Sequence, residues 1–303
     1  MAEITHEDLS MGDTTKPARR RGRPKRMAPE DHPSQGAEPR MAENFDEYLF
    51  YIRTAQGGCI KNFVEAIRDD VSSIPMEVGY DGIHIYIENP KEKVKVSIDL
   101  LKNNFDSQYH VKKPVVFYVD SHNLCKLLRI VNTSSRIALM MVDTPDNKVL
   151  NICIDTVSGP NVLTYDIKVD MEVRELGTPV SPEGHMVSMS SGTLISYCKH
   201  FAFFGASIDI RKYQNIVSII NNCECANKMA SIMVDCDPAT DPDYDVPIQN
   251  RYKVSNITEF GKCSNLSKTV SLYLSNDHPL VIEYNVGILG TLRISIPTYN
   301  GDV

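Results

Sequence analysis

The residues best placed to do chemistry are basic side chains that recur beside apolar stripes in four short segments. The stripes repeat every three or four residues, as on one face of a helix, in residues 60–67, 124–131, 194–201 and 257–260. Lysine and arginine outside such a stripe can contact nucleic-acid phosphates without reading bases. A solvated helix face is the commonest alternative for any single residue, but four basic faces in one acidic chain favour a binding surface. The candidates are Lys61, Arg68, Lys126, Arg129, Lys199 and Lys262.

A second basic cluster lies near the N-terminus, where residues 19–26 read Arg-Arg-Arg-Gly-Arg-Pro-Lys-Arg. Gly22 lets the backbone approach the floor of a minor groove and Pro24 keeps the segment extended. Arginines on either side can then enter the narrow, electronegative groove of A·T tracts. The segment resembles an AT-hook with the candidate residues Arg21, Gly22, Arg23, Pro24, Lys25 and Arg26. A nuclear-localisation signal would look nearly the same, the two can coexist, and a solvated tail is the third interpretation.

No pattern predicts catalysis, a cofactor or a metal site. The acidic run Asp235 to Asp245 lacks the central glycine and final glutamate of a calcium-binding loop and contains two prolines. Cys223 and Cys225 have no second cysteine pair at ligand spacing. Glycine-rich phosphate loops and nucleophile elbows are also absent from the sequence. We therefore predict a protein that is not an enzyme.

Composition limits how the chain can bind nucleic acid. The 303 residues are 42% hydrophobic and 23% charged, with a formal net charge of -7. An acidic chain must attract DNA through local basic clusters rather than through its total charge. The eight cysteines are scattered mostly inside apolar runs, as expected in a reducing compartment. No apolar run approaches the length of a membrane span, so we predict a soluble intracellular protein without a membrane partner.

The remaining pattern is rich in strands. Apolar residues alternate in residues 83–87, 94–100, 152–154, 216–220, 270–274 and 292–296, between short polar turns. Closely spaced strands with short turns indicate antiparallel sheets. Two of the four helical segments fall in each half of the chain, which indicates an internal duplication.

These patterns predict an α+β fold in four parts. Residues 1–42 form a disordered basic tail, because their composition offers too little apolar surface to bury. An N-terminal domain with antiparallel strands and two helical segments follows at residues 43–170. Residues 171–189 form an extended connector, since two prolines and two glycines lie within Leu176–Gly184. A second domain of the same kind covers residues 190–303.

Two segments carry a resemblance to a known family. Residues 163–179 read Leu-Thr-Tyr-Asp-Ile-Lys-Val-Asp-Met-Glu-Val-Arg-Glu-Leu-Gly-Thr-Pro. Residues 265–284 contain Leu-Tyr-Leu-Ser-Asn-Asp-His-Pro-Leu-Val-Ile-Glu-Tyr and precede Leu-Gly-Thr-Leu-Arg at 289–293. Both resemble the proliferating cell nuclear antigen family, and the resemblance extends over about Tyr48 to Thr298. The divergence elsewhere is consistent with a clamp from a large DNA virus.

The resemblance implies two duplicated clamp domains, each with antiparallel sheets backing two helices, joined by an extended interdomain connector. Three subunits would join head to tail through edge strands, with helices lining the hole of the ring. The expected function is a sliding DNA clamp, a processivity factor that encircles double-stranded DNA and tethers replication and repair proteins. The six helix-face cations match basic positions of the family, whereas Asn62 and Phe203 replace residues that are often basic or imidazole. The expected location is the nucleus, or a cytoplasmic viral replication site.

The same resemblance implies a groove for short peptides of a DNA polymerase and other replication or repair proteins. The matching positions are Leu176, Thr178, Pro179, Pro279, Ser295 and Pro297. Thr178 replaces a usual aliphatic residue and Ser295 a common aromatic one, so a changed peptide preference is expected. A clamp loader is a further expected partner. The alternatives are a clamp-like subunit of a transcription or checkpoint hetero-complex and an AT-hook protein that tethers its body to DNA.

Overall fold

The computed structural model describes residues 45–69, 71–105, 108–155, 162–172, 176–223, 226–234 and 244–301. The chain divides into two compact units, residues 1–40 and 41–303, and the described residues belong to the second. The AT-hook-like motif, nearly all of the acidic run and Cys225 lie outside the described residues. Within them, no helix is long and apolar enough to cross a membrane.

The first half of the second unit alternates strands with two helices. Its elements are η1 Phe45–Glu47, β1 Tyr48–Thr54, α1 Gly57–Ile67, β2 Ser73–Val78, β3 Gly82–Asn89, β4 Val94–Leu101, η2 Lys102–Asn104, β5 Tyr109–Val111, β6 Val115–Asp120, α2 Ser121–Leu128, β7 Arg136–Val142, β8 Val149–Asp155 and β9 Val162–Lys168.

The second half repeats this plan. Its elements are β10 His185–Ser190, α3 Ser191–Phe201, β11 Ser207–Tyr213, β12 Ile216–Cys223, β13 Ala226–Met233, β14 Ile248–Lys253, α4 Val254–Thr258, η3 Glu259–Asn265, β15 Thr269–Leu274, β16 Leu280–Val286 and β17 Gly290–Ile296. Strand β10 takes in residues 185–189 at the end of the predicted connector, and residues 176–184 before it contain no helix or strand.

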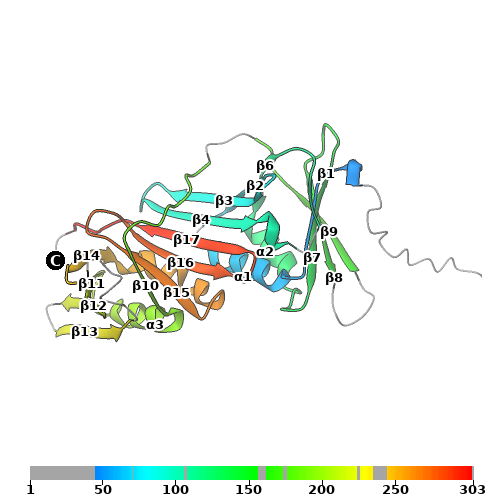
Figure 1. Ribbon diagram of the computed structural model, residues 1–303. Coiled ribbons are helices and arrows are strands. Elements are labelled where there is room, and N and C mark those ends of the chain that lie inside the picture. Colours follow the sequence, from blue (N-terminus) through cyan, green and yellow to red (C-terminus); the bar gives the residue numbers. More distant parts are fainter. Residues whose placement is uncertain are drawn as a thin grey trace, which may run out of the picture. The chain divides into compact units, whose positions relative to one another are not determined.

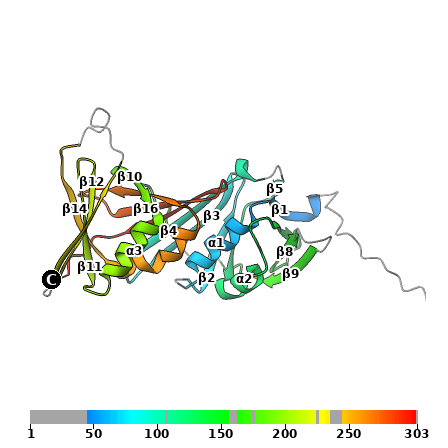
Figure 2. The same cartoon turned by 90° about the horizontal axis from the view of Figure 1, so that it is seen from below.

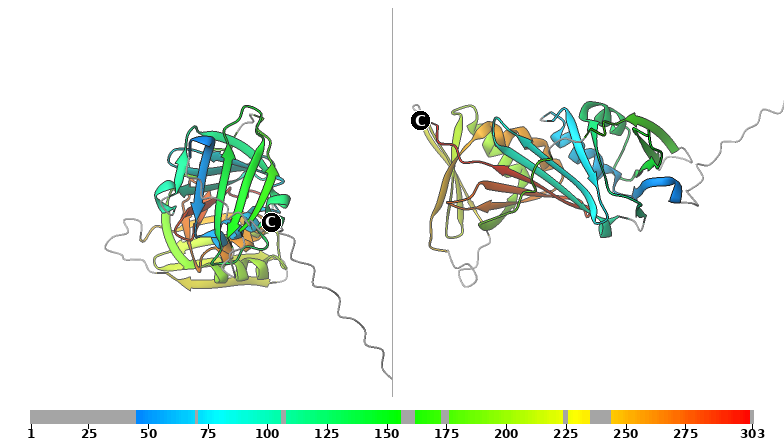
Figure 3. Two further views of the ribbon diagram at one scale, coloured as in Figure 1. Left: turned by 90° about the vertical axis from the view of Figure 1, so that its right-hand side faces the viewer. Right: turned by 90° about the horizontal axis from the view of Figure 1, so that it is seen from above.

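The strands form three antiparallel sheets whose order shows the duplication (Figure 1). The central sheet has the order β10-β15-β16-β17-β4-β3-β2-β6, with half of its strands from each half of the chain. The flanking sheets have the orders β5-β1-β7-β8-β9 and β13-β12-β11-β14 and lie at its two ends (Figure 3). In chain order, β1, β7, β8 and β9 correspond to β10, β15, β16 and β17. Likewise β2, β3, β4 and β6 correspond to β11, β12, β13 and β14. This duplicated α+β fold confirms the predicted fold class.

The two halves meet where β17 pairs with β4. Leu292 lies opposite Ile98 and Ile294 opposite Val96, and all four side chains are buried on one face. On the other face, Asp99 accepts hydrogen bonds from Tyr86 (2.9 Å) and Ser97 (3.3 Å). Arg293 lies 3.6 Å from Asp99 and donates from Nε to Glu283 (2.6 Å). Apolar burial and a charged network therefore both connect the halves.

The helices form one layer against the sheets (Figure 2). Neighbours in this layer are α2 with α1, α1 with η3, and α4 with α3. Asp120 accepts a hydrogen bond from the backbone N–H of Asn123 (2.7 Å) at the start of α2, and Ser190 accepts one from Thr193 (3.3 Å) at the start of α3. The predicted fourth helix is broken, because α4 ends at Thr258 and the backbone departs from helical geometry at Phe260 (ψ 18°).

Candidate nucleic-acid interface and partner groove

All six predicted phosphate-binding cations lie in or directly after elements of the helical layer. Lys61 is on α1 and Arg68 caps its C-terminus; Lys126 is on α2 and Arg129 caps its C-terminus. Lys199 is in the last turn of α3 and Lys262 is in η3. The apolar residues of each helix face the sheets, so charged side chains are left on the other face. The structure thus brings together cations from distant parts of the chain.

Three of these cations already have partners within the protein. Lys61 Nζ donates to the carbonyl oxygens of Arg129 (3.2 Å) and Val131 (3.0 Å), which fixes the C-terminal end of α2 against α1. Arg68 Nε and Nη2 contact Asp69 Oδ1 at 2.9 and 2.8 Å. Lys262 Nζ contacts the other oxygen of the same carboxylate. Hydrogen bonds from Lys262 and Arg68 lower the pKa of Asp69, so it is charged near neutral pH.

The other three cations are exposed. Lys126, Arg129 and Lys199 form no ion pair with the residues that the structure describes. The stem of Lys199 lies against η3, where a Cβ added to Gly261 would come within 3.3 Å of Lys199 Cε. Phe203 follows α3 and is 84% exposed, so it adds an apolar side chain rather than charge to this end of the layer.

Among the residues that the structure describes, each flanking sheet ends in a strand of seven or eight residues that pairs with another strand on a single side. Strand β9 ends the first sheet and β13 ends the other. The opposite edge of the β13 sheet, β14, receives contacts from other segments: the Gln249 N–H donates to Asn276 Oδ1 (3.1 Å), and the Tyr299 N–H donates to the Arg251 carbonyl (2.8 Å). Unpaired edges readily accept another strand. In the duplicated plan, β9 and β13 correspond to β17 and β4, which pair with each other inside the chain.

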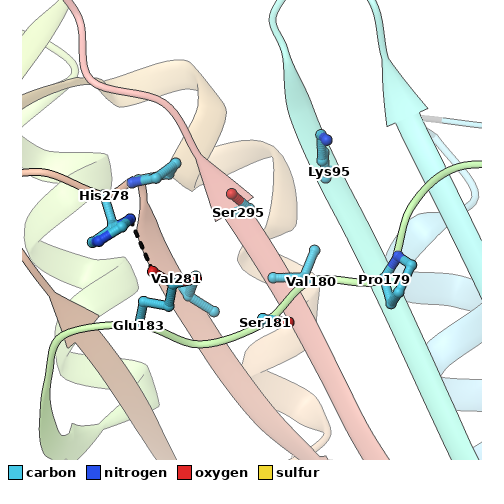
Figure 4. A pocket seen from close by; sticks show the side chains of 9 residues that line it. Lys95, Pro179, Val180, Ser181, Glu183, His278, Val281 and Ser295 are labelled. Carbon is cyan, nitrogen blue, oxygen red and sulfur yellow. Dashed lines mark ion pairs between the residues drawn. The ribbon is translucent and has the colours of Figure 1, made fainter.

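A surface groove lies between the connector and the central sheet (Figure 4). Its volume is about 270 Å³, and an ion pair between His278 Nδ1 and Glu183 Oε2 (3.0 Å) lies at the side of the connector. Gly177 packs closely on β3, because an added Cβ would lie 3.0 Å from the Tyr86 carbonyl. The lining residues are Lys95, Pro179, Val180, Ser181, Glu183, His278, Pro279, Val281 and Ser295.

Three of the six predicted groove residues, Pro179, Pro279 and Ser295, line this groove. Leu176, Thr178 and Pro297 are not among its lining residues; instead, the Thr178 hydroxyl accepts a hydrogen bond from Lys95 Nζ (3.0 Å). The lining residues that the sequence did not indicate include Val281, which precedes Ile282 in the apolar run of β16. Alternation along that strand could have placed Val281 with Glu283 on the face opposite to that of Leu280 and Ile282, which belong to the hydrophobic core.

In the described part of the chain, these features define a class: a duplicated α+β subunit with a cation-bearing helical layer, the sheet edges β9 and β13 open on one side, and a groove beside its connector. Residues 49–175 match the family described as "Proliferating cell nuclear antigen, N-terminal domain", and residues 182–299 match "Proliferating cell nuclear antigen, C-terminal domain". The chain belongs to the proliferating cell nuclear antigen family. The predicted family resemblance is confirmed.

Two relatives illustrate the similarity. The chain is 24% identical over 260 residues to the proliferating cell nuclear antigen of Chaetomium thermophilum, across 84% of this chain and 99% of that protein. It is also 24% identical over 262 residues to a protein named "Probable DNA polymerase sliding clamp 1" from Paramecium bursaria Chlorella virus 1. That alignment covers 83% of this chain and 97% of the viral protein.

Proposed function

We propose that this protein is a sliding DNA clamp, a homotrimeric ring without enzymatic activity that encircles duplex DNA and holds a DNA polymerase there. The observation that carries this proposal is the correspondence between the free edges β9 and β13 and the internal pair β17 and β4. If β9 of one subunit pairs with β13 of the next, each junction between subunits repeats the junction within a subunit. Family membership and the name of the viral relative support the same function.

In this ring the helical layer faces the DNA. Cations on that layer would contact phosphates of any sequence, as sliding requires. Retention on DNA would then depend on closure of the ring rather than on tight phosphate binding.

The mass of the full chain in solution tests this proposal. Light scattering at several concentrations and two salt levels should give three times the 34.0 kDa of one chain. A loaded ring should also remain on closed circular DNA and leave the same DNA after linearisation. A monomer at every concentration would overturn the self-assembled ring and favour a subunit of a transcription or checkpoint hetero-complex.

We further propose that the groove beside the connector binds short peptides of the polymerase and other replication or repair proteins, and that a clamp loader opens the ring. Val180, Pro279 and Val281 contribute apolar surface to this groove, which suits an apolar anchor residue of a bound peptide. Lys95 at the same groove would favour an acidic residue beside that anchor.

Ser295→Arg should block this groove, because a long charged side chain would occupy a volume of only about 270 Å³. We expect a loss of affinity of roughly tenfold or more for a fluorescent peptide taken from a polymerase, measured by anisotropy. Thr291→Arg is the matched control, since Thr291 lies on the same face of β17 and does not line the groove. Equal peptide binding by wild type and Ser295→Arg would exclude this groove as the peptide site.

The basic tail carries a second proposal, supported by its Arg-Gly-Arg-Pro sequence. Residues 21–26 would bind the minor groove of A·T tracts, serve as a signal for the nucleus, or do both. If the protein belongs to a virus whose DNA is replicated in the cytoplasm, DNA binding is the relevant role of this segment. Arg21→Ala with Arg23→Ala should remove any preference for A·T-rich over G·C-rich duplex, and an unchanged preference would exclude the hook.

A further inference from the structure

Among the residues that the structure describes, Asp69 is the acidic residue that directly contacts two of the proposed DNA-facing cations. It follows the C-cap of α1, and its side chain is 55% exposed. One carboxylate oxygen contacts Arg68 and the other contacts Lys262, although Lys262 is 193 residues further along the chain. A single carboxylate therefore holds two of the six candidate cations.

The geometry of Asp69 resembles that of a bound phosphate. A guanidinium donates to it from Nε and Nη2, and an ammonium approaches from the other side. Arginine and lysine engage phosphate oxygens with the same donors. A DNA phosphate that approaches Arg68 or Lys262 must therefore compete with Asp69 for these donors.

Two other acidic groups of the helical layer that the structure describes, Glu65 and Asp120, do not have this arrangement. Glu65 lies on α1 four residues before Asp69, and no ion pair links it to a cation in the described part of the chain. Asp120 accepts a hydrogen bond from the backbone N–H of Asn123 at the start of α2. Lys61 is held by backbone carbonyls, which are neutral partners.

We propose that Asp69 is an internal competitor of DNA phosphates that weakens the hold of the ring on DNA. This inference rests on the proposed clamp function and specifies how the DNA-facing surface is regulated. While Asp69 holds Arg68 and Lys262 and backbone carbonyls hold Lys61, the members of the six candidates that remain available to phosphates are Lys126, Arg129 and Lys199. Fewer phosphate contacts release fewer counterions, so the ring binds DNA less tightly and meets less resistance as it slides.

The test uses the full chain with Arg21→Ala and Arg23→Ala as the parent, so that the tail does not dominate binding. Affinity for a short blunt-ended fluorescent duplex is measured by anisotropy across a series of salt concentrations. Asp69→Asn should bind about three- to tenfold more tightly at low salt. The plot of log affinity against log salt should steepen by about 0.9 for each cation that gains a phosphate contact.

Glu65→Gln is the matched control, because it removes one negative charge from α1, four residues before Asp69, without releasing a paired cation. It should stay close to the parent in affinity and slope. If Asp69→Asn and Glu65→Gln give the same change, the effect is one of net charge and the competitor role is overturned. Weaker binding by Asp69→Asn would also overturn it, because Asp69 would then position the cations for DNA.

Lys262→Gln supplies an independent readout. Lys262→Gln should change DNA affinity little in the parent, because Asp69 holds Lys262 there. It should weaken DNA binding more in the Asp69→Asn background. Equal losses of affinity in both backgrounds would contradict competition. Lys126→Ala separates this inference from the proposed function. Removing this exposed cation should weaken DNA binding both in the parent and in the Asp69→Asn background. If Lys126→Ala binds DNA as tightly as the parent does, the proposed DNA interface is wrong, and the role proposed for Asp69 is wrong as well.

Discussion

Ile232→Asp is expected to convert the trimer into monomers and to abolish retention on closed circular DNA. Ile232 lies on the free edge strand β13, where it is half-buried and packs against the hydrophobic core. If β9 of the next subunit pairs here, the new carboxylate is enclosed without a partner. An unpaired buried charge costs several kcal/mol, enough to prevent association through one strand pair. Light scattering measures the mass, and circular dichroism shows whether the subunit remains folded.

Met233→Asp is the matched control for this prediction. Met233 is the next residue of β13, its side chain lies on the other face of the strand, and it is 79% exposed. A carboxylate there stays in water, so Met233→Asp should remain a trimer. A trimeric Ile232→Asp protein, or a monomeric Met233→Asp protein, would show that the junction between subunits is not built on this edge as proposed.

The second large effect is expected from removing the three exposed cations of the helical layer together. A variant with Lys126→Ala, Arg129→Ala and Lys199→Ala should bind duplex DNA at least about tenfold more weakly at low salt. Its log–log salt dependence should flatten by about 0.9 for each phosphate contact that is lost. Anisotropy with short duplexes of differing sequence measures both quantities, and the loss should be similar for every sequence because phosphates carry no base information.

The control variant removes the same charge from other surfaces. Lys91, Lys113 and Lys148 are exposed and lie in turns or links between strands, outside the helices. Replacing all three with alanine should change DNA affinity much less, and both variants should remain trimers. If the two triple variants lose affinity equally, DNA responds to the total charge of the chain and the helical layer is not its binding surface.

Periodicity predicted the elements of this fold well, because burial on one face leaves a direct trace in sequence. The alternation in residues 83–87 became β3, and the stripe of residues 60–67 became α1. The break at Phe260 left no such trace, since Ile257 and Phe260 keep helical spacing across it. Contacts between distant segments could not be predicted either. No pattern in the sequence indicates that Asp69 contacts Lys262 or that β4 pairs with β17.

The groove shows the same limit on a smaller scale. Pro179, Pro279 and Ser295 were predicted and do line it, but Leu176, Thr178 and Pro297 do not. Which connector residue faces the groove depends on how the connector lies over β3 and β4, where Gly177 approaches the Tyr86 backbone and Lys95 binds Thr178. An extended segment without regular pairing has no period from which these orientations could be predicted.

The junction between β17 and β4 also bears on how a closed ring would open. That junction lies within one covalent chain and combines buried apolar side chains with the network of Asp99, Arg293 and Glu283. Separating it would expose the core of both halves. The proposed β9–β13 junction would join two separate chains, so it could part without breaking the central sheet of either one. If the proposed loader pulls on the ring, a contact between subunits should therefore break first and each eight-stranded sheet should remain intact.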